Sequence, residues 1–154
     1  MKQTKGFSMV ALAATGLAFL LFAFNTRPGA HSVQVYVDDK LVVERFIDTR
    51  LDAPRVVLDP AHNQQLIVRY NECGRTVMGR KLTIRSSKGA MLKQWSFAGE
   101  STGFGNPMSC SVKELSALKS KDAPLRLYYT SKDFPEGQQI ASLVFSSGPG
   151  SASK

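Results

Sequence analysis

Several short patterns in the sequence have the residue types of a catalytic or anion-binding site, and each lacks a part that the chemistry requires. Residues 74–81, GRTVMGRK, have the glycine spacing of a phosphate-binding loop. No lysine directly follows the second glycine, and a strand pattern replaces the helix that would build the anion site. Ser116 and Lys119 have the spacing of a serine–lysine acyl-transfer motif, but its companion motifs Ser-Asp-Asn and Lys-Thr-Gly are absent. Neither pattern predicts an active site.

Histidine and carboxylate chemistry has few residues to use. His31 lies in a linker and His62 in a predicted turn, and no Gly-x-Ser-x-Gly sequence supplies a nucleophile. The aspartates at 38, 39, 48, 52 and 59 include candidates for an acid–base pair, but spacing alone does not show which of them converge. The sequence has neither zinc-ligand spacing nor a calcium loop. We therefore predict no catalytic residue, no metal site and no cofactor.

Cys73 and Cys110 are the only two cysteines, and they do not form a Cys-x-x-Cys motif. In an exported chain an even number of cysteines indicates a disulfide. A bridge between them would close a loop of about 38 residues and stabilise the fold by roughly 4 kcal/mol. We predict this disulfide, which would hold a strand end and a helix start together.

The candidate partner-binding residues lie in or near the loop from Gly99 to Pro107. Glycines flank Phe104 on both sides, so its ring is expected at the tip of a flexible loop, where it either tucks back or meets a partner. Arg75 and Arg80 would join this surface if the disulfide drew the two loops together. We predict Phe104 as an apolar anchor, with Arg75 and Arg80 as its basic rim.

Alternation of apolar and polar residues predicts β-strands through most of the chain after residue 30. Turns rich in Asp, Asn, Pro and Gly separate them. About eight short strands are expected, near 32–37, 41–47, 55–58, 66–70, 80–85, 90–97, 125–130 and 140–145. One short helix should follow Ser111, because Ser111 and Glu114 have the spacing of a capping box.

These elements predict a mainly β domain over residues 31–146, an antiparallel β-sandwich of immunoglobulin-like or similar type with one short helix. Residues 147–154 are rich in Gly and Ser and are predicted to be disordered. The expected core contains Leu66, Val68, Leu82, Ile84, Trp95, Leu125, Leu127 and Leu143.

Residues 1–30 have the pattern of an export signal. Lys2 and Lys5 precede a nearly all-apolar stretch from Phe7 to Phe24, and a polar turn follows. We predict either a cleaved signal peptide or an apolar helix that anchors the chain in the membrane through residues 7–24, because a stretch of about 18 apolar residues can cross a bilayer. The lysines at the start place the domain outside, in the periplasm or extracellular space, tethered to the inner membrane if the segment is uncleaved.

The sequence Lys5-Gly6-Phe7-Ser8-Met9-Val10 resembles a type IV pilin leader, which is cut between the glycine and the phenylalanine. Pro28 falls where many pilins place a helix-kinking proline. The chain departs from the pilin pattern at Ala11, where pilins carry an acidic residue, and at Val33, where strand alternation begins in place of a continued helix. The resemblance implies a pilus-like assembly subunit with an N-terminal hydrophobic helix.

The formal net charge is +8, from 20 Lys and Arg against 12 Asp and Glu. A basic face can meet nucleic acid, anionic lipid or acidic glycan, but no basic run here is dense enough to act as a binding tail. Arginines that alternate with apolar residues along strands are typical of a solvated face. The expected partner is an envelope protein or glycan, together with the membrane if residues 7–24 are uncleaved, and no nucleic acid.

Taken together, the sequence predicts an exported, non-enzymatic bacterial cell-envelope module that binds or scaffolds another macromolecule. A pilus-like subunit and an envelope hydrolase are the alternatives. Polymerisation through the N-terminal helix would favour the pilus-like subunit. Two close carboxylates in a cleft, or a carboxylate beside His62, would favour the hydrolase.

Overall fold

The computed structural model describes residues 31–47, 51–119 and 124–146. The signal peptide or membrane anchor, the pilin-like leader and the disordered tail at 147–154 are predictions that lie outside the described residues. In the described part, no helix is both long enough and apolar enough to span a membrane.

The described part of the chain is mainly β, with eleven strands and one short helix. The eight predicted strands are all present, and three strands were not predicted: β9 and the very short β5 and β8. In chain order the elements are β1 (Ser32–Val37), β2 (Lys40–Phe46), β3 (Arg55–Leu58), β4 (Gln65–Asn71), β5 (Thr76–Val77), β6 (Arg80–Arg85), β7 (Met91–Phe97), β8 (Ser101–Thr102), β9 (Met108–Ser111), α2 (Val112–Ala117), β10 (Leu125–Thr130) and β11 (Gln138–Phe145).

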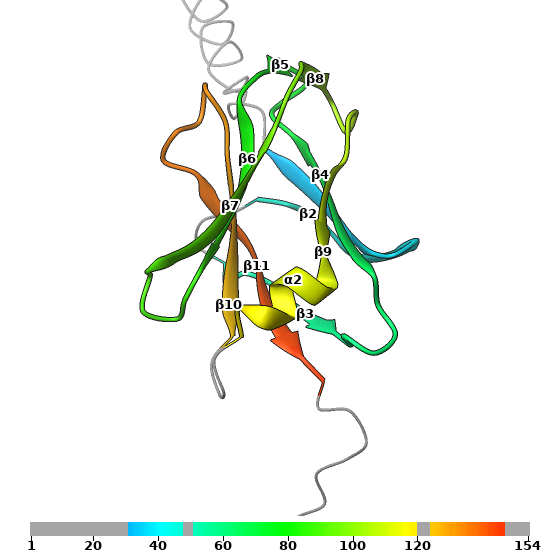
Figure 1. Ribbon diagram of the computed structural model, residues 1–154. Helices are drawn as coiled ribbons and strands as arrows, with labels where there is room; N and C mark the ends of the chain where they lie inside the picture. Colours follow the sequence, from blue (N-terminus) through cyan, green and yellow to red (C-terminus); the bar gives the residue numbers. More distant parts are fainter. Residues whose placement is uncertain (1–30, 48–50, 120–123, 147–154) are drawn as a thin grey trace, which may run out of the picture.

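The strands form a four-stranded sheet of order β2-β1-β4-β9, a five-stranded sheet of order β3-β11-β10-β6-β7, and the small pair β5-β8 (Figure 1). Neighbouring strands are antiparallel except β3 and β11, which run parallel. A purely antiparallel arrangement is therefore wrong at this edge. The carbonyl of Pro54 accepts the Ser142 N–H at 2.8 Å, so β3 pairs with the last strand and not with a neighbour in sequence.

One hydrophobic core draws buried side chains from both larger sheets. Along β1, Val33 and Val35 are fully buried, as the alternation predicts. Seven of the eight predicted core residues are buried, and Trp95 alone is half-buried against the core. Trp95 keeps one side in solvent because β7 is an edge strand. Two sheets around one shared core fit the predicted β-sandwich.

The helix α2 begins where it was predicted, but the capping box does not form. Ser111 is the N-cap with an extended backbone, and its side chain makes no capping hydrogen bond. Glu114 instead accepts hydrogen bonds from Lys93 Nζ at 2.9 Å and from Trp95 Nε1 at 3.3 Å, both on β7. With Val112 buried at its start, α2 lies across the side of the molecule between β9 and β7.

Gly137, before β11, has a positive φ of 70°. A Cβ there would lie 2.8 Å from the Tyr129 carbonyl oxygen and would overlap the Thr130 side chain. We expect Gly137→Ala to lower the free energy of unfolding by about 2–4 kcal/mol, because strain at positive φ adds to a steric clash. Urea denaturation at equilibrium measures this change.

Gly89→Ala is the matched control. Its φ is 89°, but a Cβ at position 89 would meet no atom within 4 Å. It should therefore show only the backbone contribution, about 1–2 kcal/mol. Equal losses in the two variants would show that the close approach at Gly137 does not matter.

Candidate functional site

The structure contradicts the predicted disulfide between Cys73 and Cys110. Cys110 on β9 is the register partner of Leu66 on β4, and Cys73 lies seven residues farther along the chain, past the end of β4. At about 3.3 Å per strand residue, this separation is on the order of 20 Å, whereas disulfide-bonded Cα atoms lie within about 7 Å of one another. Burial raises the pKa of the Cys110 thiol to about 12, while Cys73 is exposed.

The two loops that this bridge was expected to join are nevertheless neighbours. β5 and β8 pair antiparallel, with Thr76 opposite Thr102 and their hydroxyl oxygens 2.9 Å apart. Phe104 is half-buried, so its ring neither tucks fully into the core nor stands free in solvent. Its carbonyl oxygen accepts a 3.5 Å hydrogen bond from Arg69 Nη1, and Arg75 beside β5 is exposed.

Arg80 is not part of this surface, which corrects the predicted basic rim. It is 3 % exposed, and its Nη1 donates to the Asn106 carbonyl oxygen at 2.6 Å. Arg80 is the first residue of β6 and faces inward, so its guanidinium supports the Gly99–Pro107 loop from inside. A contact role for Phe104 and Arg75 stays a prediction, whereas Arg80 lies in the interior.

Arg80 belongs to a buried polar cluster with Tyr70, Glu72 and Tyr129, which the sequence did not reveal. The rings of Tyr70 on β4 and Tyr129 on β10 stack with centroids 3.9 Å apart and planes 14° apart. Tyr129 Oη donates to Glu72 Oε1 at 2.8 Å. Burial first, and then the Glu72 carboxylate, raise the pKa of both phenols far above the usual value. Both phenols therefore stay protonated; Tyr129 donates to Glu72, and the Tyr70 hydroxyl lies 3.2 Å from His31 Nδ1.

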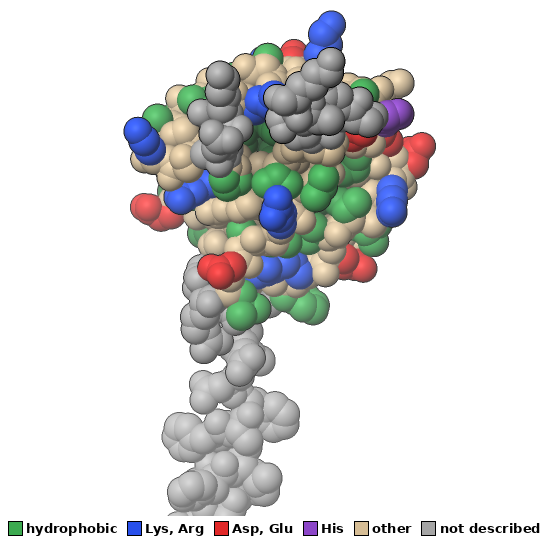
Figure 2. Space-filling view, turned by 90° about the horizontal axis from the view of Figure 1, so that it is seen from below, with side chains coloured by type: hydrophobic (Ala, Val, Ile, Leu, Met, Phe, Trp, Pro, Cys, Tyr) green, Lys and Arg blue, Asp and Glu red, His purple; other side chains and the backbone are tan. Residues whose placement is uncertain are grey.

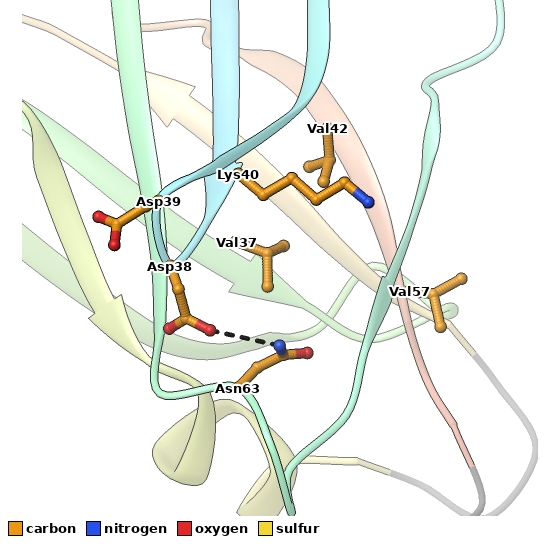
Figure 3. Close-up of a pocket in the computed structure, with 7 residues that line it drawn as sticks. All are labelled: Val37, Asp38, Asp39, Lys40, Val42, Val57 and Asn63. Carbon is orange, nitrogen blue, oxygen red and sulfur yellow. Dashed lines mark hydrogen bonds between the residues drawn. The ribbon is translucent and has the colours of Figure 1, made fainter.

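A hollow opens at the other end of β1, between the β1–β2 hairpin and β3 (Figure 3). The register of β1 with β2 shifts between Val35 and Tyr36, which leaves Val42 as an extra, bulged residue. Val42 and Val57 contribute apolar side chains to the hollow, and Lys40 runs alongside Val42. The hollow is lined by Val37, Asp38, Asp39, Lys40, Val42, Val57 and Asn63.

We call the side of the molecule that carries this hollow and the edge strands β2 and β3 the open side. It comprises Leu41, Val42 and Phe46 on β2, Leu51 in the link, and Val57 on β3. These are five of the eight large hydrophobic residues that are exposed in the described part of the chain, and Phe46 is 71 % exposed. β2 and β3 are the edge strands of the two larger sheets, so this side of the molecule ends in strand edges, whereas α2 lies across the opposite side.

The end of the molecule where β3 and α2 lie has a different surface. Seen from below in Figure 2, apolar side chains gather in the middle of this face with basic side chains among them, and further basic and acidic side chains stand around its margin. Charges of both signs are typical of a solvated surface. Charge alone does not mark this end as a binding site.

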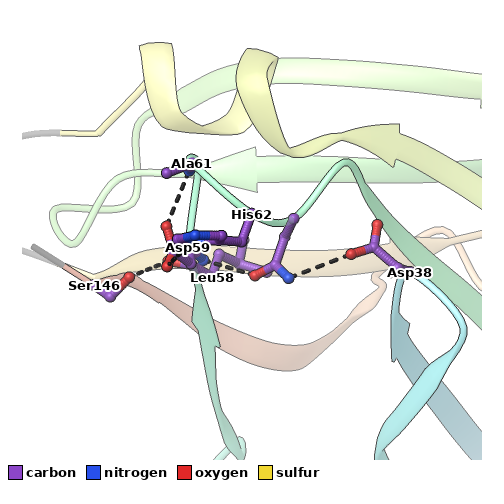
Figure 4. Close-up of polar contacts among 7 residues, drawn as sticks. Asp38, Leu58, Asp59, Ala61, His62 and Ser146 are labelled. Carbon is purple, nitrogen blue, oxygen red and sulfur yellow. Dashed lines mark hydrogen bonds and ion pairs between the residues drawn. The ribbon is translucent and has the colours of Figure 1, made fainter. Parts of the chain in front are cut away.

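A carboxylate does lie beside His62, as a hydrolase would require. His62 Nδ1 and Asp59 Oδ2 are 2.8 Å apart, and this hydrogen bond is the main cause of the lowered pKa of Asp59 (Figure 4). The contact spans three residues of one turn, and the other Asp59 oxygen accepts the Ala61 N–H at 2.9 Å. The His62 side chain is 76 % exposed. This geometry is that of an Asp-stabilised turn.

Asp38 ties the β1–β2 hairpin to the start of β4. Its Oδ1 accepts the backbone N–H groups of Gln64 and Gln65, each at 2.9 Å, and its Oδ2 accepts Asn63 Nδ2 at 3.3 Å. The bonds from Gln65 and Gln64 are the main causes of a lowered pKa at Asp38. Asp38 has a positive φ of 53°, a conformation that Asp and Asn tolerate. Its carboxylate is therefore engaged in structural hydrogen bonds.

Among the described residues, no group of three or more His, Cys, Asp or Glu is placed to hold a metal ion. No family model matches the sequence, and no curated protein shows significant similarity to it. The function has to be argued from the surfaces of the molecule.

The buried cluster generates a test of stability. Tyr129→Phe removes the hydroxyl that donates to Glu72 and leaves a buried carboxylate oxygen without this bond. We expect it to lower the free energy of unfolding by about 1–3 kcal/mol. Tyr128→Phe, at the next position and half-buried on the outer face, should change stability by less than about 0.5 kcal/mol. Chemical denaturation decides, and similar losses in both variants would mean that the Tyr129 hydroxyl has no special role.

The hydrogen bonds of Asp38 predict a pH dependence. Because its pKa is lower in the folded than in the unfolded state, its stabilising effect is present above about pH 4 and is lost as the pH falls through the folded value. Asp38→Asn should be less stable than the wild type at neutral pH, and the two stability curves should converge in acid. The Asp39→Asn variant controls for the change in net charge. Curves for wild type and Asp38→Asn that stay parallel down to about pH 2 would contradict the expectation.

Proposed function

We propose that the protein is an exported, non-enzymatic β-sandwich module of the cell envelope that binds or scaffolds another envelope protein. The observation that carries this proposal is the open side, where five of the eight exposed large hydrophobic residues in the described part of the chain lie on the edge strands β2 and β3 or in the link between them. Exposed apolar side chains concentrated in one region are typical of protein interaction sites.

The open side has the composition of a small protein interface. Val42, Val57 and Phe46 supply apolar contact area, and Lys40 and Asp39 supply charges at the margin. An apolar centre with a polar rim is the usual anatomy of such interfaces. The bulge at Val42 and the charges of Glu44 and Arg45 make uncontrolled strand pairing along β2 unfavourable. These features support recognition of a defined partner.

Export is proposed from the lysine-led apolar segment at residues 1–30. The immunoglobulin-like form of the sandwich is likewise a proposal, which the two sheets around one core support. The hydrolase alternative is weaker, because the carboxylates of Asp59 and Asp38 already accept structural hydrogen bonds from backbone N–H groups. The pilus-like alternative depends on the leader outside the described residues.

Site-specific photo-crosslinking tests the binding proposal. With the photoreactive p-benzoylphenylalanine at position 46 of the full chain, irradiation of cells that express it should yield one discrete adduct, because Phe46 stands on the open side. Met91, which is 60 % exposed on the edge strand β7, is the matched control position and should yield none. Introducing Val57→Ser should weaken the adduct at position 46. Adducts of equal intensity at both positions, or none at either, would contradict the proposal.

The same cells test export. The full chain should fractionate with the periplasm or the membrane, because the apolar segment directs it out of the cytoplasm. A chain that is recovered intact from the cytosolic fraction would overturn the envelope assignment, whatever the crosslinking shows.

A further inference from the structure

The outer face of the five-stranded sheet is basic and carries no acidic residue. The strands β3, β6, β7, β10 and β11 are fully described, and none of them contains Asp or Glu. They contain six basic residues. Arg80 is buried and Lys93 is bonded to Glu114, which leaves Arg55, Lys81, Arg85 and Arg126. The alternation of buried and accessible positions places these four on the outer face.

Three of the four lie in one row across the sheet. The strand registers place Arg55 opposite Ser142, Ser142 opposite Arg126, and Arg126 opposite Arg85. Three spacings of about 4.8 Å between strands make this row roughly 14 Å long. A row of this length suits a short run of linked sugars better than a single small anion.

Arg85 and Arg126 are directly opposite one another, and like charges at such positions destabilise a sheet. The Arg85 guanidinium lies over the Tyr128 ring, 4.6 Å from its centroid, a position that a cation favours. Two like charges thus meet on strands that carry no acidic residue to neutralise them, and a carboxylate ligand would pair with both.

The neighbouring rows add hydrogen-bonding groups. Tyr128 is the register partner of Thr83, which in turn faces Gln94. Gln94 Nε2 donates to Thr83 Oγ1 at 3.0 Å, and the next row brings Lys81 opposite Thr130. Amides and hydroxyls beside guanidinium groups match a ligand that carries both carboxylates and hydroxyls, because arginine binds carboxylates through paired hydrogen bonds.

We propose that this outer face binds an acidic polysaccharide of the cell envelope, with Arg85 and Arg126 as the central carboxylate-binding residues. The proposal deepens the proposed function and rests on export to the envelope. The centre of this face, at Arg85 and Arg126, lies away from the open side, which adjoins the face at β3, where Arg55 and Val57 both point outward. Nucleic acid is a poorer match, because its binding proteins typically neutralise about 6–10 phosphates and this face offers four cations.

The test is a binding titration of the purified full chain with a decameric oligogalacturonate. Its methyl ester is the matched ligand control, since esterification removes the charges and keeps the sugars. The acid should bind and the ester should not. Arg85→Gln combined with Arg126→Gln should weaken binding at least about tenfold, because two charge-assisted hydrogen-bonding groups are lost. Lys88→Gln combined with Lys113→Gln removes the same charge from two exposed positions outside the row and should weaken the binding of the acid less than about threefold.

Thermal unfolding of the double variant separates binding from folding. The double variant should change the Tm little, because relief of the repulsion offsets the loss of the Arg85–Tyr128 contact, whereas a mainly structural role for these arginines would lower the Tm clearly. The proposal would be overturned if the control double variant lost as much affinity for the acid as the arginine double variant, or if the methyl ester bound. Tighter binding of oligothymidylate or of phosphatidylglycerol vesicles than of the acidic sugar would also overturn it. Recovery of the chain from the cytosol would instead contradict export to the envelope. The titration would still show whether the outer face of the five-stranded sheet binds the acidic sugar.

Discussion

The stacked rings of Tyr70 and Tyr129 join the two larger sheets at the end where β5 and β8 lie, and much of the surrounding structure follows from them. Tyr70 belongs to β4 and Tyr129 to β10, so the 3.9 Å stack spans the interface between the sheets. A buried phenol needs a hydrogen-bond acceptor, and Glu72 supplies it. A buried carboxylate in turn favours a nearby cation, and Arg80 is close enough to offset part of the rise in the pKa of Tyr129. Arg80 then donates to Asn106 and positions the Gly99–Pro107 loop.

This packing also determines which surfaces remain available to partners. With the sheets joined at one end and α2 bonded to β7 through Glu114, the side between β7 and β9 is occupied. The side between β2 and β3 retains exposed apolar side chains. The outer face of the five-stranded sheet, by contrast, carries arginines that no acidic residue on its strands neutralises. Two surfaces of different chemistry thus lie on one small domain, and this combination is suited to a module that holds a protein and a charged polymer together.

Sequence reasoning succeeded where the physical signal is local. Alternation predicted the strands because side chains of a strand point to opposite faces, so burial of one face leaves a period of two in the sequence. The same rule placed Leu82 and Leu127 in the core. It was less accurate at Trp95, because alternation cannot show whether a strand lies at the centre or the edge of a sheet. The helix start at Ser111 was also predicted, although Glu114 turns to β7 and leaves the capping box unformed.

The amino-acid sequence by itself determined eight of the eleven strands of the described part, the turns between many of them, the short helix and most of the core, because each depends on residues within a few positions of one another. Tertiary structure decided the rest. The register of β4 with β9 separates Cys73 from Cys110, and the inward direction of Arg80 removes it from the predicted rim. The parallel pairing of β3 with β11, the bulge at Val42 and the row from Arg55 to Arg85 all arise between strands that are distant in sequence. Such contacts depend on which strands become neighbours and on the register of each pair. A local sequence pattern specifies neither the neighbours nor the register.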